Sequence, residues 1–199
     1  MKLLYLVPNI NNEGGVARVL AIKTHYLIEK WDYNIDFLTQ NNGSFPQFYN
    51  FNKKIGFHDI ILKRNSIQFL FDYKTKLNHQ IELLKPDVII VCDNGIKAFL
   101  LPFILKTKIP IVLEIHSSLS VVEKENDSIF NLIGTHLSIL FKKFAARSFD
   151  NFVVETAESI KEWNVPDGII IPNPLWFYTD KFAKLNSKKV IAVGRHVYE

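Results

Sequence analysis

The chain has 199 residues, of which 48% are hydrophobic and 22% charged, and its formal net charge is +4. This composition excludes a disordered chain, and the length allows one large domain, or one domain with part of another. No block of basic residues stands out, which argues against a nucleic-acid-binding protein, whereas the mild positive balance suits phosphate-bearing ligands or an anionic membrane surface.

One cysteine, Cys92, excludes an intramolecular disulfide, so nothing indicates an oxidising compartment. The apolar run near the N-terminus is too short for a signal peptide, and the most apolar stretch, residues 98–105, is far too short to span a membrane. We therefore expect a cytoplasmic protein.

Short apolar runs alternate with helical patterns along the chain. In order, we expect a strand at 2–7, a helix at 16–30, strands at 33–39 and 57–62 around a polar loop at 40–55, a helix at 66–84 and a strand at 88–92. Pro86 ends the second helix, because proline disfavours helix in the residue before it. The run at 88–92 is apolar throughout, as expected for a strand buried on both faces.

The second half continues the alternation. We expect a helix at 96–106, a strand at 111–115, a polar loop at 117–126, a helix at 128–148, a strand at 151–154, a short helix ending at Trp163 and a strand at 168–171. Strands and helices at this spacing predict right-handed βαβ crossovers. The expected fold is a Rossmann-like, doubly wound α/β domain with a mostly parallel sheet and helices on both faces.

The end of the chain departs from this pattern. Pro172-Asn173-Pro174 stops the alternation, residues 175–187 have the character of a linker, and residues 188–196 predict a new strand and turn. A lone apolar strand leaves its backbone groups unpaired. We therefore expect an N-terminal domain at 1–174, a linker at 175–187 and the first strand of a second domain at 188–199. We also expect residues 190–193 to pack against the first domain or a neighbouring molecule, with Arg195 turned away from the ligand-binding rim.

Polar residues follow five of the expected strands. Ligands of open parallel sheets bind at the carboxyl ends of the strands, which share one edge. The segments expected at this rim are 11–15, 93–95, 116–118, 155–158 and Asn173. Asp93 at the end of the fourth strand is one of the candidate ligand-binding residues.

Gly14 and Gly15 lie between the first strand and the first helix. Without side chains the backbone can approach a ligand closely, and the helix N-terminus offers free N–H groups to phosphate. The spacing matches neither the dinucleotide-binding GxGxxG nor a P-loop. Two interpretations therefore remain: a turn that binds phosphate, and a glycine-rich turn without a ligand.

His116 is the candidate catalytic residue, because histidine can donate, accept and titrate near neutral pH. The alternative is a strand-end histidine that hydrogen-bonds to backbone. Glu114 lies two residues earlier on the same strand, so it points to the same side and can support the ring. Glu155 and Glu158 are candidate acids or bases, or else they cap the next helix with Thr156 as its N-cap.

Lys142, Lys143 and Arg147 cluster on the helix expected at 128–148, beside Phe141 and Phe144. This pattern predicts a solvated basic face with the phenylalanines on a core face; the alternative is a helix that lies on a membrane surface. The chain contains no paired-cysteine metal motif, no His-Glu-x-x-His and no Gly-x-Ser-x-Gly, so we expect no metal and no cofactor.

Six segments in order resemble glycosyltransferase family 4, the retaining enzymes with the two-domain GT-B fold. They are residues 14–18 (GGVAR), 85–89 (KPDVI), 114–117 (EIHS), 150–159 (DNFVVETAES), 170–174 (IIPNP) and 190–195 (VIAVGR). The resemblance implies transfer of a sugar, with retention, from a nucleotide-diphospho-sugar to a glycan or glycolipid acceptor, as in polysaccharide biosynthesis. The nucleotide sugar is then a co-substrate and no cofactor is needed.

The resemblance also implies roles for particular residues. Gly14 and Gly15 would approach the donor's phosphates and sugar, His116 would lie near the transferred sugar, and Arg195 would hold the diphosphate with a lysine a few residues on. We group Arg18, Asp93 and Asn173 with the donor-binding residues, and Glu114, Ser117, Glu155 and Thr156 as supporting residues.

The 199 residues also depart from the family pattern. They contain neither the partner lysine of Arg195 nor the family's Glu-x7-Glu element, and Ser117 stands where many relatives have aspartate. Because a diphosphate leaving group needs preorganised positive charge, we expect this chain alone not to transfer sugar. Two alternatives remain: a non-catalytic phosphate- or glycan-binding module, and a flavodoxin-like domain whose glycine loop holds a cofactor phosphate.

Overall fold

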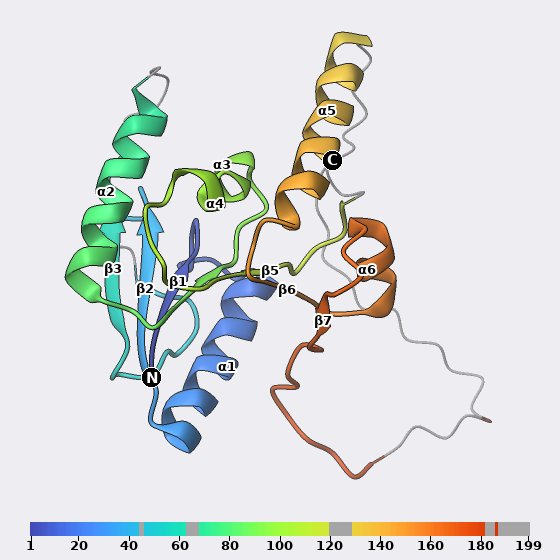
Figure 1. The fold of residues 1–199 in the computed structure, drawn as a ribbon. Helices are drawn as coiled ribbons and strands as arrows, with labels where there is room; N and C mark the ends of the chain where they lie inside the picture. Colours follow the sequence, from blue (N-terminus) through green and yellow to red (C-terminus); the bar gives the residue numbers. More distant parts are fainter. Residues whose placement is uncertain (44–45, 63–67, 120–128, 182–185, 187–199) are drawn as a thin grey trace.

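A computed structural model describes residues 1–43, 46–62, 68–119, 129–181 and 186 (Figure 1). Within this part of the chain, seven strands form one sheet in the order β3-β2-β1-β4-β5-β6-β7, and all neighbouring strands are parallel. The strands are β1 (Lys2–Leu6), β2 (Asn34–Gln40), β3 (Gly56–Ile60), β4 (Val88–Val91), β5 (Ile111–Glu114), β6 (Asn151–Val154) and β7 (Ile169–Ile170). The predicted Rossmann-like α/β fold is confirmed.

The helices are α1 (Gly15–Trp31), α2 (Phe69–Leu84), α3 (Ile96–Phe99), α4 (Leu101–Ile104), α5 (Ile129–Ala146) and α6 (Ala157–Trp163). Helix α2 ends as predicted: Lys85 adopts a left-handed conformation just before Pro86. The single helix expected at 96–106 is wrong. Pro102 lies in the first turn of α4, where it lacks the N–H that a continuous helix would need, so the chain forms two short helices.

The sheet separates two hydrophobic clusters. On one face, α1 packs through Leu20 and Ile28 against the side chains of Tyr5 and Phe37. The larger cluster on the other face takes buried residues from α2, α3, α4, α5 and α6, and within it Trp163 stacks on Phe99 with ring centres 5.5 Å apart. Helices therefore cover both faces, as predicted.

Helix α5 corrects the expectation for the basic cluster. Ala145 and Ala146 are fully buried, and Lys142 lies on the same helical face three to four residues earlier. Lys142 is accordingly only 5% exposed, and its Nζ lies 5.7 Å from the centre of the Phe99 ring. The predicted solvated basic face is wrong for Lys142, whose pKa is lowered by burial.

The predicted core face of α5 is also partly wrong. Phe141 packs against the large cluster, but Phe144 is 63% exposed and stacks on Phe103. Leu137 and Leu140 are exposed as well, because α5 meets the sheet through its last turns and its earlier turns project beyond the sheet (Figure 1). Within the described residues, no helix has the length and apolar character needed to cross a membrane.

Strand β7 forms one edge of the sheet and is followed by an exposed segment. Residues 171–181 adopt neither helix nor strand. The division into a domain, a linker and a second domain stays a prediction. The strand expected at 188–196, with Arg195 and the packing of residues 190–193, lies outside the described residues, so these expectations stay predictions.

Candidate functional site

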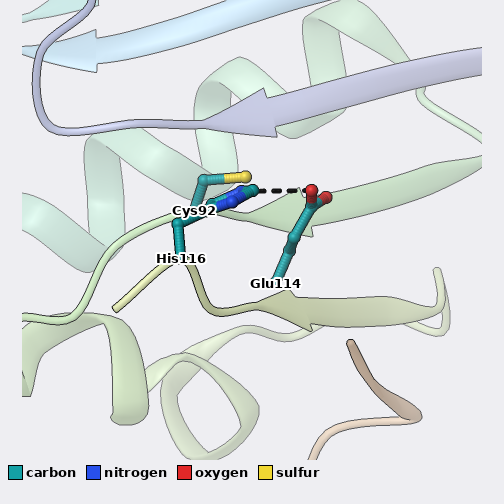
Figure 2. A group of neighbouring side chains, drawn as sticks. All are labelled: Cys92, Glu114 and His116. Atoms are coloured by element: carbon teal, nitrogen blue, oxygen red, sulfur yellow. Dashed lines mark ion pairs between the residues drawn. The ribbon is translucent and has the colours of Figure 1, made fainter. Parts of the chain in front are cut away.

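The candidate site lies where the strand order reverses. Strand β1 pairs with β2 on one side and with β4 on the other, so the connections leave β1 in opposite directions, which is where open α/β sheets bind ligands. A cavity of about 370 Å³ opens there at the carboxyl ends of β1, β4 and β5. Its walls include Asn12, Gly14, Gly15, Val16, Cys92, Asp93, Asn94, Gly95, Glu114 and His116. Figure 2 shows how three of them, Cys92, Glu114 and His116, lie side by side.

The glycine loop forms one wall of the cavity. The Asn12 side chain accepts a 2.8 Å hydrogen bond from the Gly14 N–H, and Gly14 is the N-cap of α1 without a side-chain cap of its own. A Cβ on Gly14 would lie 2.6 Å from the Asn12 Oδ1 atom, whereas a Cβ on Gly15 would meet nothing within 4 Å. A side chain on Gly14 would therefore displace Asn12 from this hydrogen bond, while the space beside Gly15 is open to a ligand.

Replacing Gly15 by leucine is expected to separate binding from stability. Leucine favours helix more than glycine, so thermal stability should be unchanged or slightly higher, while the new side chain obstructs the approach to the α1 N-terminus. Affinity for a phosphate-bearing ligand should fall about tenfold or more, measured by calorimetry. Gly134→Leu is the matched control, because a Cβ at this helical glycine also meets nothing within 4 Å. Equal affinity in the two variants would contradict a ligand at Gly15.

The loop after β4 forms a second wall. The Asp93 Oδ1 atom accepts a 2.7 Å hydrogen bond from the Gly95 N–H, and its Oδ2 atom lies 3.6 Å from the Lys97 Nζ atom. The Asn94 amide hydrogen-bonds to the Ser117 hydroxyl and so joins the loops that follow β4 and β5. Ser117 therefore holds Asn94 without lining the cavity, whereas Asp93 lines it.

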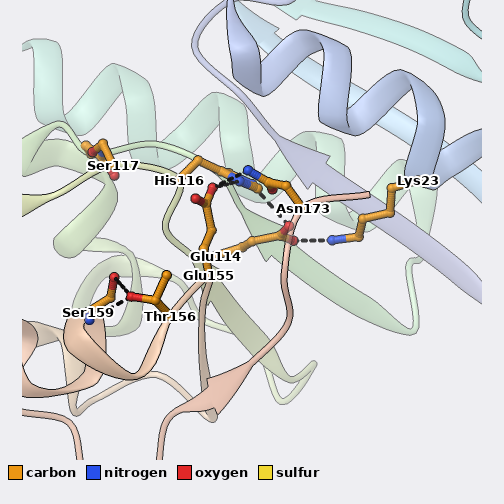
Figure 3. Close-up of polar contacts among 9 residues, drawn as sticks. Lys23, Glu114, His116, Ser117, Glu155, Thr156, Ser159 and Asn173 are labelled. Carbon is orange, nitrogen blue, oxygen red and sulfur yellow. Dashed lines mark hydrogen bonds and ion pairs between the residues drawn. The ribbon is translucent and has the colours of Figure 1, made fainter. Parts of the chain in front are cut away.

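Charged side chains from three elements meet at His116 (Figure 3). Its Nε2 atom lies 3.1 Å from the Glu114 Oε1 atom, and its Nδ1 atom lies 3.2 Å from the Glu155 Oε1 atom. Lys23 of α1 forms an ion pair with the second oxygen of Glu114. The Asn173 amide donates a 2.6 Å hydrogen bond to Glu155. The result is one chain of contacts from Lys23 to Asn173, with the imidazole in its middle.

This arrangement shifts the pKa values of its members. Burial by itself raises the pKa of Glu114, but contact with His116 and the charge of Lys23 outweigh it and hold the pKa at about 2. Burial by itself lowers the pKa of His116, but Glu114 and Glu155 outweigh it and the pKa is raised. His116 therefore keeps its proton to a higher pH than a free histidine, which suits contact with an anionic ligand.

The remaining predicted residues lie at or beyond the edge of this site. Thr156 is the N-cap of α6, since its hydroxyl accepts a 3.2 Å hydrogen bond from the Ser159 N–H. Glu158 is exposed in the first turn of that helix, where capping contacts lower its pKa. Arg18 does not line the cavity; its guanidinium lies 6.0 Å from the Trp176 ring centre and borders a separate hollow with Tyr49.

Sequence reasoning missed Lys23 and Cys92 as members of the site. Lys23 lies in the middle of α1, and only the rotation of that helix over the sheet brings its side chain to Glu114. Cys92 is a buried residue at the end of an apolar strand. Its place opposite Glu114 follows from the β4–β5 register, in which Val91 pairs with Leu113 one residue earlier on each strand.

Comparison with known proteins shows a shared fold. No protein-family model matches the chain. No curated protein matches it either. Among solved structures, it is similar to the lipopolysaccharide outer core galactosyltransferase WaaB, with a TM-score of 0.62, 14% identity, and coverage of 88% of this chain and 46% of that one.

Two further structures have the same fold. Anabaena Alr3699/HepE, solved with UDP and glucose, gives a TM-score of 0.60 at 16% identity and covers 88% of this chain and 45% of that one. A putative UDP-N-acetylglucosamine 2-epimerase from Listeria monocytogenes gives a TM-score of 0.52 at 11% identity, with coverage of 83% and 41%. The chain spans somewhat less than half the length of these proteins, and its fold is that of one half of the GT-B glycosyltransferases.

Proposed function

We propose that the chain is the acceptor-side domain of a retaining glycosyltransferase of the family 4 type. In this proposal, the cavity at the carboxyl ends of β1, β4 and β5 receives the sugar and phosphates of a nucleotide-sugar donor, and a glycan or glycolipid acceptor binds at the same rim. The observation that carries the proposal is the convergence of the open Gly15 turn, the N-terminus of α1 and His116 on one cavity.

The geometry supports distinct roles for these groups. The first turn of α1 contains no acidic residue, so its N–H groups and the helix dipole favour a phosphate. His116 has a raised pKa and lines the same cavity, so it can hydrogen-bond to a sugar hydroxyl or to the leaving phosphate. Glu155 orients the ring through Nδ1, and Asn173 holds Glu155 in turn.

The test is ligand binding followed residue by residue in the amide NMR spectrum. Addition of UDP-glucose is expected to shift the signals of Gly14, Gly15 and His116, and Gly15→Leu is expected to suppress these shifts. Flavin mononucleotide in a parallel titration examines the flavodoxin-like alternative. Shifts confined to other surfaces, or shifts caused by the flavin and not by the nucleotide sugar, would overturn the proposal.

The isolated chain is expected to show no sugar transfer and no donor hydrolysis when it is incubated with a panel of nucleotide sugars. The described residues at the cavity supply one helix N-terminus and one histidine, which is little positive charge for a diphosphate leaving group. Product analysis by mass spectrometry is the measurement. Efficient turnover would mean that the diphosphate is held by groups other than those proposed.

Peripheral association with an anionic membrane is a further part of the proposal, and the structure changes which residues could contribute. Lys142 is buried, and the Arg147 guanidinium donates hydrogen bonds to the Asn164 carbonyl, so Lys143 is the residue of the cluster expected to matter most. Beside it, Leu140 and Phe144 offer exposed apolar surface. Contact with the membrane through this end of α5 is the geometry to test.

Lys143→Gln is expected to weaken binding to phosphatidylserine-containing vesicles about fivefold in a salt-sensitive way, since one lysine near such a surface contributes about 1 kcal/mol. Vesicle sedimentation at two salt concentrations measures it, with Lys30→Gln at the end of α1 as the control. If the unaltered protein does not sediment with the vesicles, this part of the proposal is wrong.

A further inference from the structure

The carboxylate of Glu114, at the end of β5, is shared between two cations. Lys23 of α1 forms an ion pair with its Oε2 atom, and the Nε2 atom of His116 lies 3.1 Å from its Oε1 atom (Figure 3). Within the described residues, these two side chains are the cations that contact the carboxylate. The Glu114 side chain is only 8% exposed, so little water is available to replace a lost partner.

The two contacts differ in quality. The Lys23 Nζ atom is held both by the carboxylate and by the ring of Tyr5, whose centre lies 5.5 Å away. The contact with His116 is an ion pair without the alignment of a hydrogen bond, because the buried Nε2 atom has no hydrogen-bond partner. The other ring nitrogen of His116 is hydrogen-bonded to Glu155. Lys23 is therefore the firmer partner of Glu114, and His116 is the partner that can exchange.

Such an exchange is needed when the cavity is filled. Glu114 and His116 line the cavity, whereas Lys23 does not. If the imidazole turns its Nε2 proton to an anionic molecule in the cavity, it gives up its contact with Glu114. Without Lys23 this step would leave a buried carboxylate with no cation, which is strongly unfavourable. With Lys23 in place, the carboxylate stays paired throughout.

We propose that Lys23 is a positioning residue, which keeps Glu114 paired while His116 exchanges that carboxylate for an oxygen of the molecule bound in the cavity. No proton leaves the imidazole in this exchange; only its hydrogen-bond acceptor changes. The inference rests on the proposed function for the nature of the bound molecule, a nucleotide sugar. It assigns a role to a residue of α1 that the cavity itself does not include.

The charges around the imidazole give the direction of the effect. Burial lowers the pKa of His116, contacts with Glu114 and Glu155 raise it more, and the charge of Lys23 lowers it. Two neutral groups lie beside this cluster, because burial raises their pKa values: the Cys92 thiol of β4 and the Tyr5 hydroxyl of β1. Removal of Lys23 should therefore bind His116 more firmly to Glu114 and keep the imidazole protonated to a higher pH.

The first measurement is the pH titration of the His116 imidazole, followed by NMR. Its midpoint is expected to rise in Lys23→Met and to return to that of the unaltered protein in Lys23→Arg, which keeps the charge. Lys97→Met is the matched control, since Lys97 lies 3.6 Å from another acid of the cavity, Asp93, and should leave the midpoint unchanged. The same midpoint in Lys23→Met and in the unaltered protein would contradict the proposed role.

The second measurement is the affinity for UDP-glucose, determined by calorimetry. Lys23→Met is expected to bind about tenfold more weakly, because Glu114 then retains His116. In Glu114→Gln no charged carboxylate is left to be released, so adding Lys23→Met should change the affinity little. These two proteins serve if Lys23→Met alone does not fold, as circular dichroism would show. A tenfold loss in the Glu114→Gln background as well would mean that Lys23 acts on the ligand directly, which the proposal excludes.

The two measurements separate this inference from the function on which it rests. If the unaltered protein does not bind UDP-glucose, the proposed function is wrong, and the titration of His116 alone decides whether Lys23 acts on the imidazole. If the nucleotide sugar binds equally well to the unaltered protein and to a folded Lys23→Met, the proposed function stands and the role of Lys23 is wrong.

Discussion

Replacing Lys23 by methionine is expected to lower the free energy of unfolding by about 3 kcal/mol at pH 7, because the buried Glu114 carboxylate loses one of its two cationic partners and keeps only His116. The side chain of Glu114 is 8% exposed and that of Lys23 is 23% exposed, so solvent screens the pair only weakly. For a domain of this size the loss corresponds to a fall in Tm on the order of 10 °C. Thermal and urea unfolding are the measurements.

The loss should depend on pH in a defined direction. Burial raises the pKa of Glu114, but His116 and Lys23 lower it more, from 4.5 to about 2 in the folded protein. A depressed carboxyl pKa adds stability that is fully present above pH 4.5 and disappears as the pH falls through about 2. The difference between the unaltered protein and Lys23→Met should therefore shrink as the pH falls below 4.5.

The control for this prediction is Lys76→Met. Lys76 forms an ion pair with Asp72 at 2.8 Å, one turn away on α2, but both side chains are far more exposed than Lys23 and Glu114. Exposed pairs of this kind contribute less than about 1 kcal/mol. Similar losses in the two variants would mean that the Lys23–Glu114 pair behaves as a surface pair.

The second large effect is expected for His116→Ala. In an enzyme that contains these residues with a donor-binding domain, kcat/KM should fall about 100-fold or more, the range found for groups that transfer or hold a proton in the transition state. Steady-state assays with a nucleotide sugar, well below the melting temperature, measure it. Activity within a factor of about two would show that the histidine is structural.

The stability of this variant needs its own control. The His116 side chain is only 8% exposed and lies between two carboxylates, so its removal is also expected to lower stability. Burial lowers its pKa, yet Glu114 and Glu155 raise it more. The stabilisation is therefore fully present below pH 6.5 and is lost as the pH rises through the raised pKa. Ile81→Val, on the buried face of α2, is expected to be destabilised by about 1 kcal/mol without contact to the cavity and serves for comparison.

The sequence was sufficient to predict the fold because short apolar runs typical of strands alternate along the chain with segments whose hydrophobic residues recur at helical spacing. It also placed Gly15, Asp93 and His116 at one rim, since the carboxyl ends of parallel strands share an edge. Contacts between layers could not be predicted in the same way. Whether Lys23 meets Glu114, or Lys142 faces the core, depends on the rotation of a helix about its axis, which is fixed by small residues such as Ala145.

The order of the strands has a consequence for how the molecule folds. Strand β1 is made first on the ribosome, but one of its two neighbours, β4, begins 86 residues after the start of β1, at Val88 rather than Lys2. Contacts between such distant segments form slowly, because a long loop must close before any pairing compensates for the lost entropy. The Gly15 turn and His116 lie on opposite sides of that junction. A nascent chain whose β4 is still inside the ribosome therefore contains the glycine turn but no binding cavity. In the finished protein, a destabilised β1–β4 junction would separate the glycine turn from His116 before either half of the sheet unfolds.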